Sequence, residues 1–152
     1  MYDNWLANTT VVVVTLAAVT LSVLAHYEGL VFTSHRLQQA GGPRRVKVLY
    51  GILSMLALHV GEIWIFGVAI WALRQWPATG HIDLIGVAAA APGILDSVYL
   101  SAMTYTTVGF GDVVPVGAIR FLSGTEALTG FVMIGWSASF TYLEMERFWR
   151  VR

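Results

Sequence analysis

The sequence predicts an all-α membrane protein with three transmembrane helices and one short re-entrant helix. Hydrophobic residues make up 57% of the chain and charged residues 12%, whereas soluble domains carry about 25% charged residues. Three apolar runs are also long enough to cross a bilayer core of about 30 Å, which takes roughly 20 helical residues. A fourth apolar run is cut by proline and glycine, which points to a segment that enters the membrane without crossing it.

The three long runs are the predicted spans, and they cover Thr10 to Phe32, Val48 to Leu73 and Val116 to Leu143. The first follows an N-terminal flank that holds an aspartate and no Lys or Arg. A cleaved signal peptide begins with a positive region, so we expect the first span to remain in the mature protein. Ionisable residues inside the runs are few: His26, Glu28, His59, Glu62, Arg120 and Glu126.

The positions of Lys and Arg predict the orientation of these spans, because cytoplasmic loops carry an excess of both. One basic cluster lies between the first two spans and another follows the third, whereas the remaining loop holds only Arg74. We therefore expect residues 34–47 and the C-terminus in the cytoplasm, and the N-terminus outside, in a prokaryotic plasma membrane. The basic residues of the two clusters are Arg36, Arg44, Arg45 and Lys47, and Arg147, Arg150 and Arg152.

The fourth apolar run, from Leu84 to Val108, contains Pro92-Gly93 and is followed by Gly109 and Gly111. A helix over 95–105 is too short to cross the bilayer. Irregular backbone at membrane depth is tolerated where it is buried in protein or lines a wet cavity. The pattern therefore predicts a re-entrant helix that leads into a glycine-containing loop on the outer side.

Residues 106–112 of this loop read Thr-Thr-Val-Gly-Phe-Gly-Asp. A dehydrated potassium ion can be bound by rings of backbone carbonyl oxygens that point toward one axis. Ordinary helix and strand do not place successive carbonyls on one side, whereas glycine reaches positive φ without a steric penalty. The alternate glycines Gly109 and Gly111 suit such a row, and Thr107 adds a hydroxyl at its inner end.

Thr-Val-Gly-Phe-Gly-Asp resembles the filter signature of tetrameric potassium channels, which commonly reads Thr-Val-Gly-Tyr-Gly. The resemblance implies an outer helix at 48–73, a pore helix at 95–105, the filter at 106–112 and an inner helix at 116–143. Residues 1–47, with the first helix and the basic loop, are additional to this pore domain of residues 48–152. The implied potassium ligands are Thr107, Val108, Gly109 and Phe110, supported by Thr106, Gly111 and Asp112.

The resemblance implies a passive potassium-selective channel, not an enzyme, whose partners are K⁺, the lipid bilayer and three copies of itself. No cofactor other than the ions in the filter is expected. The net charge of zero argues against a nucleic-acid partner. No span carries the repeated Arg or Lys of a voltage sensor, and no ligand-binding domain is expected after the third span. Gly130 is a candidate gating hinge, and Val132, Gly135 and Ser139 are candidates for the cavity wall.

Three departures from the family pattern involve four positions. Phe110 lacks the phenol hydroxyl of the common tyrosine. Met103 stands where some relatives carry a pore-helix glutamate that pairs with the filter aspartate. Tyr99 and Leu100 stand where many relatives carry two tryptophans. The stability of the filter is therefore expected to depend on other contacts.

Four ionisable residues in the outer halves of the last two spans are the first place to look for those contacts. His59, Glu62, Arg120 and Glu126 are predicted to meet behind the filter. The favoured interpretation is a polar network that joins the pore helix to its scaffold, and the other is a proton- or metal-sensitive cluster. His26 and Glu28 are two residues apart and do not share a helix face. They are expected near the cytoplasmic end of the first span.

Three other functions remain open at this stage. A non-selective sodium and potassium channel has a closely related filter. An intramembrane metal enzyme built on His26, His59, Glu62 and Glu126 needs three converging ligands and leaves the filter sequence unexplained. A non-conducting accessory subunit is the third alternative, and flux through liposomes would test it.

Overall fold

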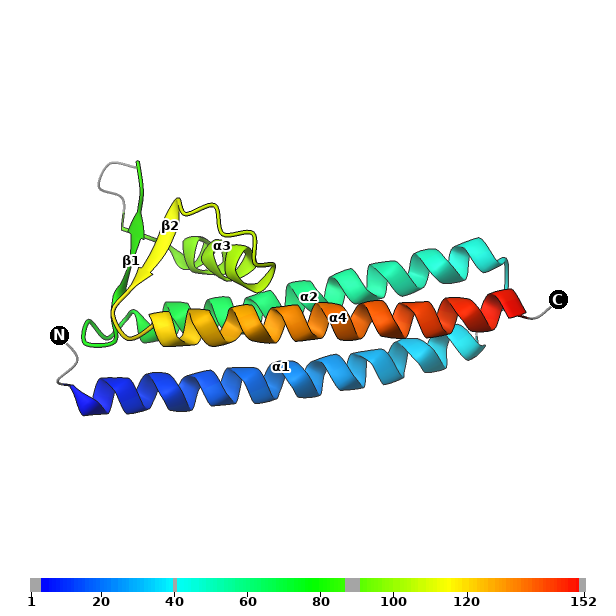
Figure 1. The fold of residues 1–152 in the computed structure, drawn as a ribbon, viewed down its shortest axis with the longest axis horizontal. Coiled ribbons are helices and arrows are strands. Elements are labelled where there is room, and N and C mark those ends of the chain that lie inside the picture. The colour runs from blue at the N-terminus through cyan, green and yellow to red at the C-terminus, as the bar shows by residue number, and fades with distance from the viewer. Residues whose placement is uncertain (1–3, 40, 87–90, 151–152) are drawn as a thin grey trace.

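The computed structural model describes residues 4–39, 41–86 and 91–150, except for the side chains of 148–150. Three long helices lie side by side, α1 and α4 running in one direction and α2 in the other (Figure 1). A short helix and a two-stranded ladder gather at the end of the bundle where α1 begins (Figure 1). The elements are α1 (Trp5–Gln39), α2 (Arg44–Leu73), β1 (His81–Leu84), α3 (Ile94–Tyr105), β2 (Val113–Val116) and α4 (Arg120–Arg150).

The long helices extend past the apolar runs that predict them. α1 has 35 residues and α2 has 30, and both are long and apolar enough to cross a membrane. The additional turns of α1 and α4 lie mainly at the end that holds the basic residues. The candidate filter loop, residues 106–112, lies beside the opposite half of the bundle (Figure 1). The mostly helical fold class is confirmed, while a crossing by α4 stays a prediction.

The start of the last helix differs from the prediction. Val116 was expected to begin the inner helix, but it ends strand β2, and α4 begins at Arg120. β2 pairs antiparallel with β1, with His81 opposite Val116 and Leu84 opposite Val113. The Val-Val-Pro-Val sequence of β2 explains the difference, because β-branched residues favour strands and proline is tolerated on an edge strand. The all-α expectation thus omitted this ladder, which continues directly from the filter.

One face of α1 consists largely of small and polar residues, and this face is buried. Small side chains let neighbouring helices approach closely in a membrane protein. α1 packs against both α2 and α4, so this face connects the N-terminal helix to the rest of the bundle. The buried residues recur every three or four positions: Ala7, Val11, Thr15, Ala18, Ser22, His26, Leu30, Thr33 and Leu37.

Candidate ion-conduction site

Helix α3 is the element that positions the filter loop. It has 12 residues, which at about 1.5 Å per residue gives roughly 18 Å, well short of the bilayer core. Asp96 in its first turn accepts a 2.5 Å hydrogen bond from the backbone N–H of Gly93, which caps the helix start. At the same end, the Arg74 guanidinium donates to the carbonyls of Pro92 and Gly93, the latter at 3.0 Å. The start of α3 is thereby joined to the end of α2.

Two glycines on the long helices let α3 approach closely. A Cβ added to Gly67 on α2 would lie 2.7 Å from Cα of Val98. A Cβ added to Gly130 on α4 would overlap the carbonyl oxygen of Tyr105. Gly130 therefore has a packing reason for being glycine, and its role as a gating hinge stays a prediction.

The backbone after α3 takes up the left-handed conformation at every second residue. The φ angles are 59° at Thr107, 55° at Gly109 and 78° at Gly111. Positive φ costs little for glycine but is uncommon for a β-branched residue such as threonine. The turn is held by hydrogen bonds from the N–H of Thr107 to the Thr104 carbonyl (3.0 Å) and from that of Gly109 to the Met103 carbonyl (3.1 Å).

The filter loop and one face of α4 lie open in the single chain. Val108 is 53% exposed and Phe110 is 70% exposed, although both side chains are apolar. On α4, Leu128 and Phe131 are 65% and 69% exposed. Large contiguous apolar surfaces usually mark sites of protein or membrane contact. The candidate cavity residues Val132, Gly135 and Ser139 are also exposed.

Asp112 is held by Tyr99, a contact that the sequence did not reveal. The Tyr99 hydroxyl donates a 2.8 Å hydrogen bond to Oδ2 of Asp112, and the Asp112 carbonyl accepts a 2.7 Å bond from the N–H of Ile85. The bond to Asp112 raises the pKa of the Tyr99 phenol, so the hydroxyl keeps its proton at neutral pH. The tyrosine thus supplies the contact for the aspartate that Met103 cannot make.

The four ionisable residues predicted to meet behind the filter do not form one cluster, so that prediction was wrong in part. Arg120 is the first residue of α4 and is exposed. Glu126 is buried and accepts a hydrogen bond from the Ser101 hydroxyl of α3. Its other carboxylate oxygen has no partner among the described residues. Only His59 and Glu62 remain together, and they are joined by a residue from α1.

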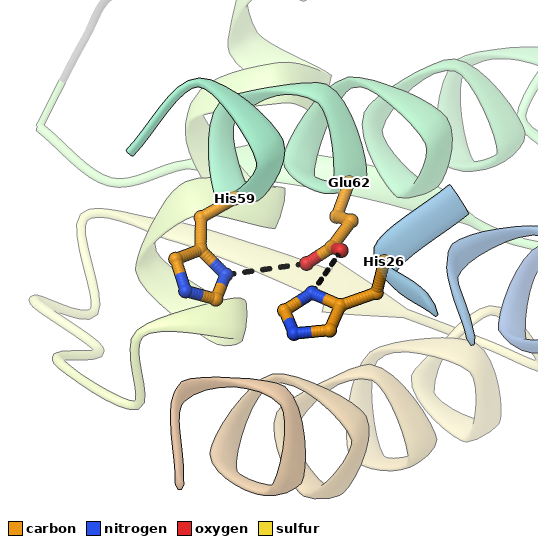
Figure 2. Close-up of side chains that lie close together, drawn as sticks. All are labelled: His26, His59 and Glu62. Atoms are coloured by element: carbon orange, nitrogen blue, oxygen red, sulfur yellow. Dashed lines mark hydrogen bonds and ion pairs between the residues drawn. The ribbon is translucent and has the colours of Figure 1, made fainter. Parts of the chain in front are cut away.

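That residue is His26, whose Nδ1 lies 2.7 Å from Oε1 of Glu62. Figure 2 shows both imidazoles turned toward the carboxylate, with Nδ1 of His59 3.2 Å from Oε2. The Tyr105 hydroxyl at the end of α3 also donates to Glu62. On α4, the Ser137 hydroxyl lies 3.3 Å from Nε2 of His26. Helices α1, α2 and α3 therefore meet at one buried carboxylate, and α4 contacts the histidine that binds it.

The position of His26 corrects a second expectation. It was placed near the cytoplasmic end of its span, but α1 extends to Gln39 and His26 lies against the middle of the bundle, fully buried. Glu28 is exposed, which agrees with the prediction that His26 and Glu28 do not share a helix face. The signal that could have found this contact is the period of small and polar residues along α1, which includes Thr15, Ser22 and His26.

Two curated relatives are similar to parts of the chain, and both are named protein LctB. The one from Geobacillus stearothermophilus is 35% identical over 85 residues, which covers 43% of this chain and 63% of the relative. The one from Bacillus caldotenax is 53% identical over 38 residues, covering 25% of this chain and 28% of the relative. The chain thus spans less than two thirds of either relative. No solved structure matches it.

A family model described as ion channel matches residues 58–145. The match contains the second half of α2, all of α3, the candidate filter loop and most of α4. It leaves out α1, and the division into an additional helix and a pore domain stays a prediction. Because the match covers 88 of the 152 residues, the chain belongs to the ion channel family.

Proposed function

We propose that the protein is the subunit of a homotetrameric, potassium-selective channel whose filter is formed by residues 106–112. The observation that carries this proposal is the left-handed backbone at Thr107, Gly109 and Gly111. Residues of positive φ that alternate with residues of negative φ can turn successive carbonyl groups to one side of the chain. In the proposed channel, the Thr107 hydroxyl and the carbonyls of Thr107, Val108, Gly109 and Phe110 replace the hydration shell of K⁺.

The exposed apolar surface supports assembly into a ring. One chain provides one column of carbonyls, and an ion on the axis needs several columns, which closed cyclic symmetry supplies. Val108 and Phe110 of the filter and Leu128 and Phe131 of α4 are more than half exposed in one chain. Neighbouring subunits would cover such side chains in the assembly.

The direction of α3 supports cation conduction. The helix ends at Tyr105, immediately before the filter, and the C-terminal end of a helix carries a partial negative charge. Four such ends around one axis would favour a cation in the cavity below the filter. Residues 106–112 lie beside the half of the bundle opposite the two basic clusters (Figure 1). This arrangement agrees with a filter at the outer side and a cytoplasmic C-terminus.

Flux measurements on the purified protein in liposomes test the proposal against its alternatives. A potassium channel releases K⁺ down its gradient much faster than it releases Na⁺, and barium blocks the release. Equal release of both ions would favour the non-selective channel. An absence of flux from correctly assembled protein would favour the accessory subunit.

A further inference from the structure

Three side chains that commonly bind metal ions converge between α1 and α2. One ligand atom from each of His26, His59 and Glu62 lies within 4.8 Å of the other two. The two imidazoles approach different oxygens of the same carboxylate, as Figure 2 shows. We propose that this cluster binds one divalent transition-metal ion of the zinc type, and that the ion joins α1 to the base of the filter.

The donor set is suited to zinc. Zinc binds imidazole nitrogen and carboxylate oxygen at about 2.0–2.2 Å in tetrahedral geometry, which keeps ligand atoms roughly 3.3 Å apart. Nδ1 of His26 and Nδ1 of His59 are already 2.7 Å and 3.2 Å from oxygens of Glu62. One ring nitrogen of His26 and one of His59 lie within 4.8 Å of each other, and small rotations of the imidazole rings and the carboxylate would bring such a pair to this spacing.

A fourth donor is present. The Tyr105 hydroxyl lies 3.0 Å from Nδ1 of His59 and is hydrogen-bonded to Glu62. It is therefore next to the three proposed ligands, where zinc in an open site holds an exchangeable oxygen ligand. Tyr105 is the last residue of α3 and is two residues from Thr107. An ion bound here would act directly on the element that carries the filter.

The surroundings of His26 add the support that metal-binding histidines usually have. A ligating histidine commonly makes a hydrogen bond through its other ring nitrogen, which fixes the orientation of the ring. Nε2 of His26 lies 3.3 Å from the Ser137 hydroxyl on α4, which leaves Nδ1 directed at Glu62. His26 and Glu62 are 0% and 1% exposed, so both are held by packing before any ion arrives.

Charge and access also favour this class of ion. A buried carboxylate carries one negative charge, and a divalent ion would more than offset it. Mg²⁺ and Ca²⁺ prefer six or more oxygen ligands, whereas imidazole suits Zn²⁺, Cu²⁺ and Ni²⁺. The His59 side chain is 16% exposed, which gives the ion a point of entry.

Cobalt(II) is a suitable probe, because it replaces zinc and shows visible absorption bands that depend on its coordination. The full chain, purified without a histidine tag and treated with a chelator, is titrated with CoCl₂. We expect one Co²⁺ per chain and bands typical of four or five ligands. In His26→Gln, Glu62→Gln and His59→Gln, we expect the affinity to fall at least about tenfold. The exposed histidines His35 and His81 are the matched controls, and their Gln variants should bind like the wild type.

Two results would overturn the proposal. One is that the wild-type chain takes up no cobalt. This test needs no variant, so it remains decisive even if a variant of a buried residue fails to assemble. The other is that His59→Gln, altered at the rim of the cluster, binds as tightly as the wild type. The titration does not depend on the proposed potassium function. A chain that binds cobalt but conducts nothing would contradict that function and leave the metal site standing.

Discussion

Nδ1 of His26 on α1 lies 2.7 Å from Oε1 of Glu62 on α2, and both side chains are buried. Glu62 also accepts a hydrogen bond from Tyr105, so the carboxylate joins the N-terminal helix to the helix that carries the filter. α1 lies outside the part of the chain matched by the family model. This contact nevertheless makes α1 part of the support for the proposed conduction site.

Replacing His26 by Leu should destabilise the folded assembly. The change leaves a buried carboxylate short of one donor, which costs about 1–3 kcal/mol. The measurement is the temperature at which the purified protein loses its assembled state, followed by size-exclusion chromatography after heating. Glu28→Gln is the control, because Glu28 is exposed on the same helix and its replacement should change nothing. Equal stability of the two variants would contradict the role of His26.

Replacing Gly67 by Ala should displace α3. The added Cβ would lie 2.7 Å from Cα of Val98, and inserting a methyl group into a well-packed site costs about 1–3 kcal/mol. We expect lower thermal stability and a smaller potassium flux. Gly61→Ala is the matched control on α2, since a Cβ there meets nothing within 4 Å. That variant should be neutral or more stable by up to about 1 kcal/mol, and the account fails if both variants behave alike.

Replacing Tyr99 by Phe should weaken the outer end of the filter, because Asp112 loses its 2.8 Å hydrogen bond. We expect faster loss of current during sustained opening. The pKa of the Tyr99 phenol is raised, so the bond is fully present below the ordinary tyrosine pKa of about 10. It is lost as pH rises through the higher, folded-state value.

Because the pKa of the Tyr99 phenol is raised, loss of current should depend on pH only in the alkaline range. The contribution of this bond to the rate of current loss in the wild type should stay constant from neutral pH up to about pH 10. Above that pH, the rate of current loss should increase toward the rate of Tyr99→Phe. Tyr27→Phe, on the exposed face of α1, is the control and should match the wild type throughout. A Tyr99→Phe channel with wild-type inactivation would rule out this role for the bond.

Replacing Arg74 by Lys tests how the start of α3 is held. The guanidinium contacts the carbonyls of Pro92 and Gly93 and the Ser97 hydroxyl. A lysine keeps the charge but cannot reproduce this planar set of donors. We expect reduced flux and earlier thermal dissociation, whereas Arg45→Lys in the first turn of α2 should have no effect. Wild-type flux and stability in Arg74→Lys would show that charge alone is sufficient there.

The parts of the fold that follow from local sequence could be predicted. Apolar length predicts the long helices, and proline and glycine signals place α3 to within one residue of its observed start at Ile94. The β1–β2 ladder was missed because its four-residue strands lie in or next to the apolar runs. Val116 was assigned to a helix for that reason.

The contacts around the candidate filter depend on how each helix is oriented about its axis relative to its neighbours. The spacing of residues along one helix does not determine this orientation. The sequence placed Glu62 near His59 because they are three residues apart on α2. It did not pair Glu62 with His26, which is 36 residues away. It also grouped Arg120 with Glu126 by depth alone, although the two point to different surroundings.

The reversal potential of single channels in planar bilayers tests the central claim most directly. With K⁺ on one side and mixed K⁺ and Na⁺ on the other, the account predicts a reversal potential that follows the potassium gradient and ignores sodium. That result is expected because backbone carbonyls at Thr107 to Phe110 would replace the hydration of K⁺. A reversal potential set by the sum of both ions would contradict the account.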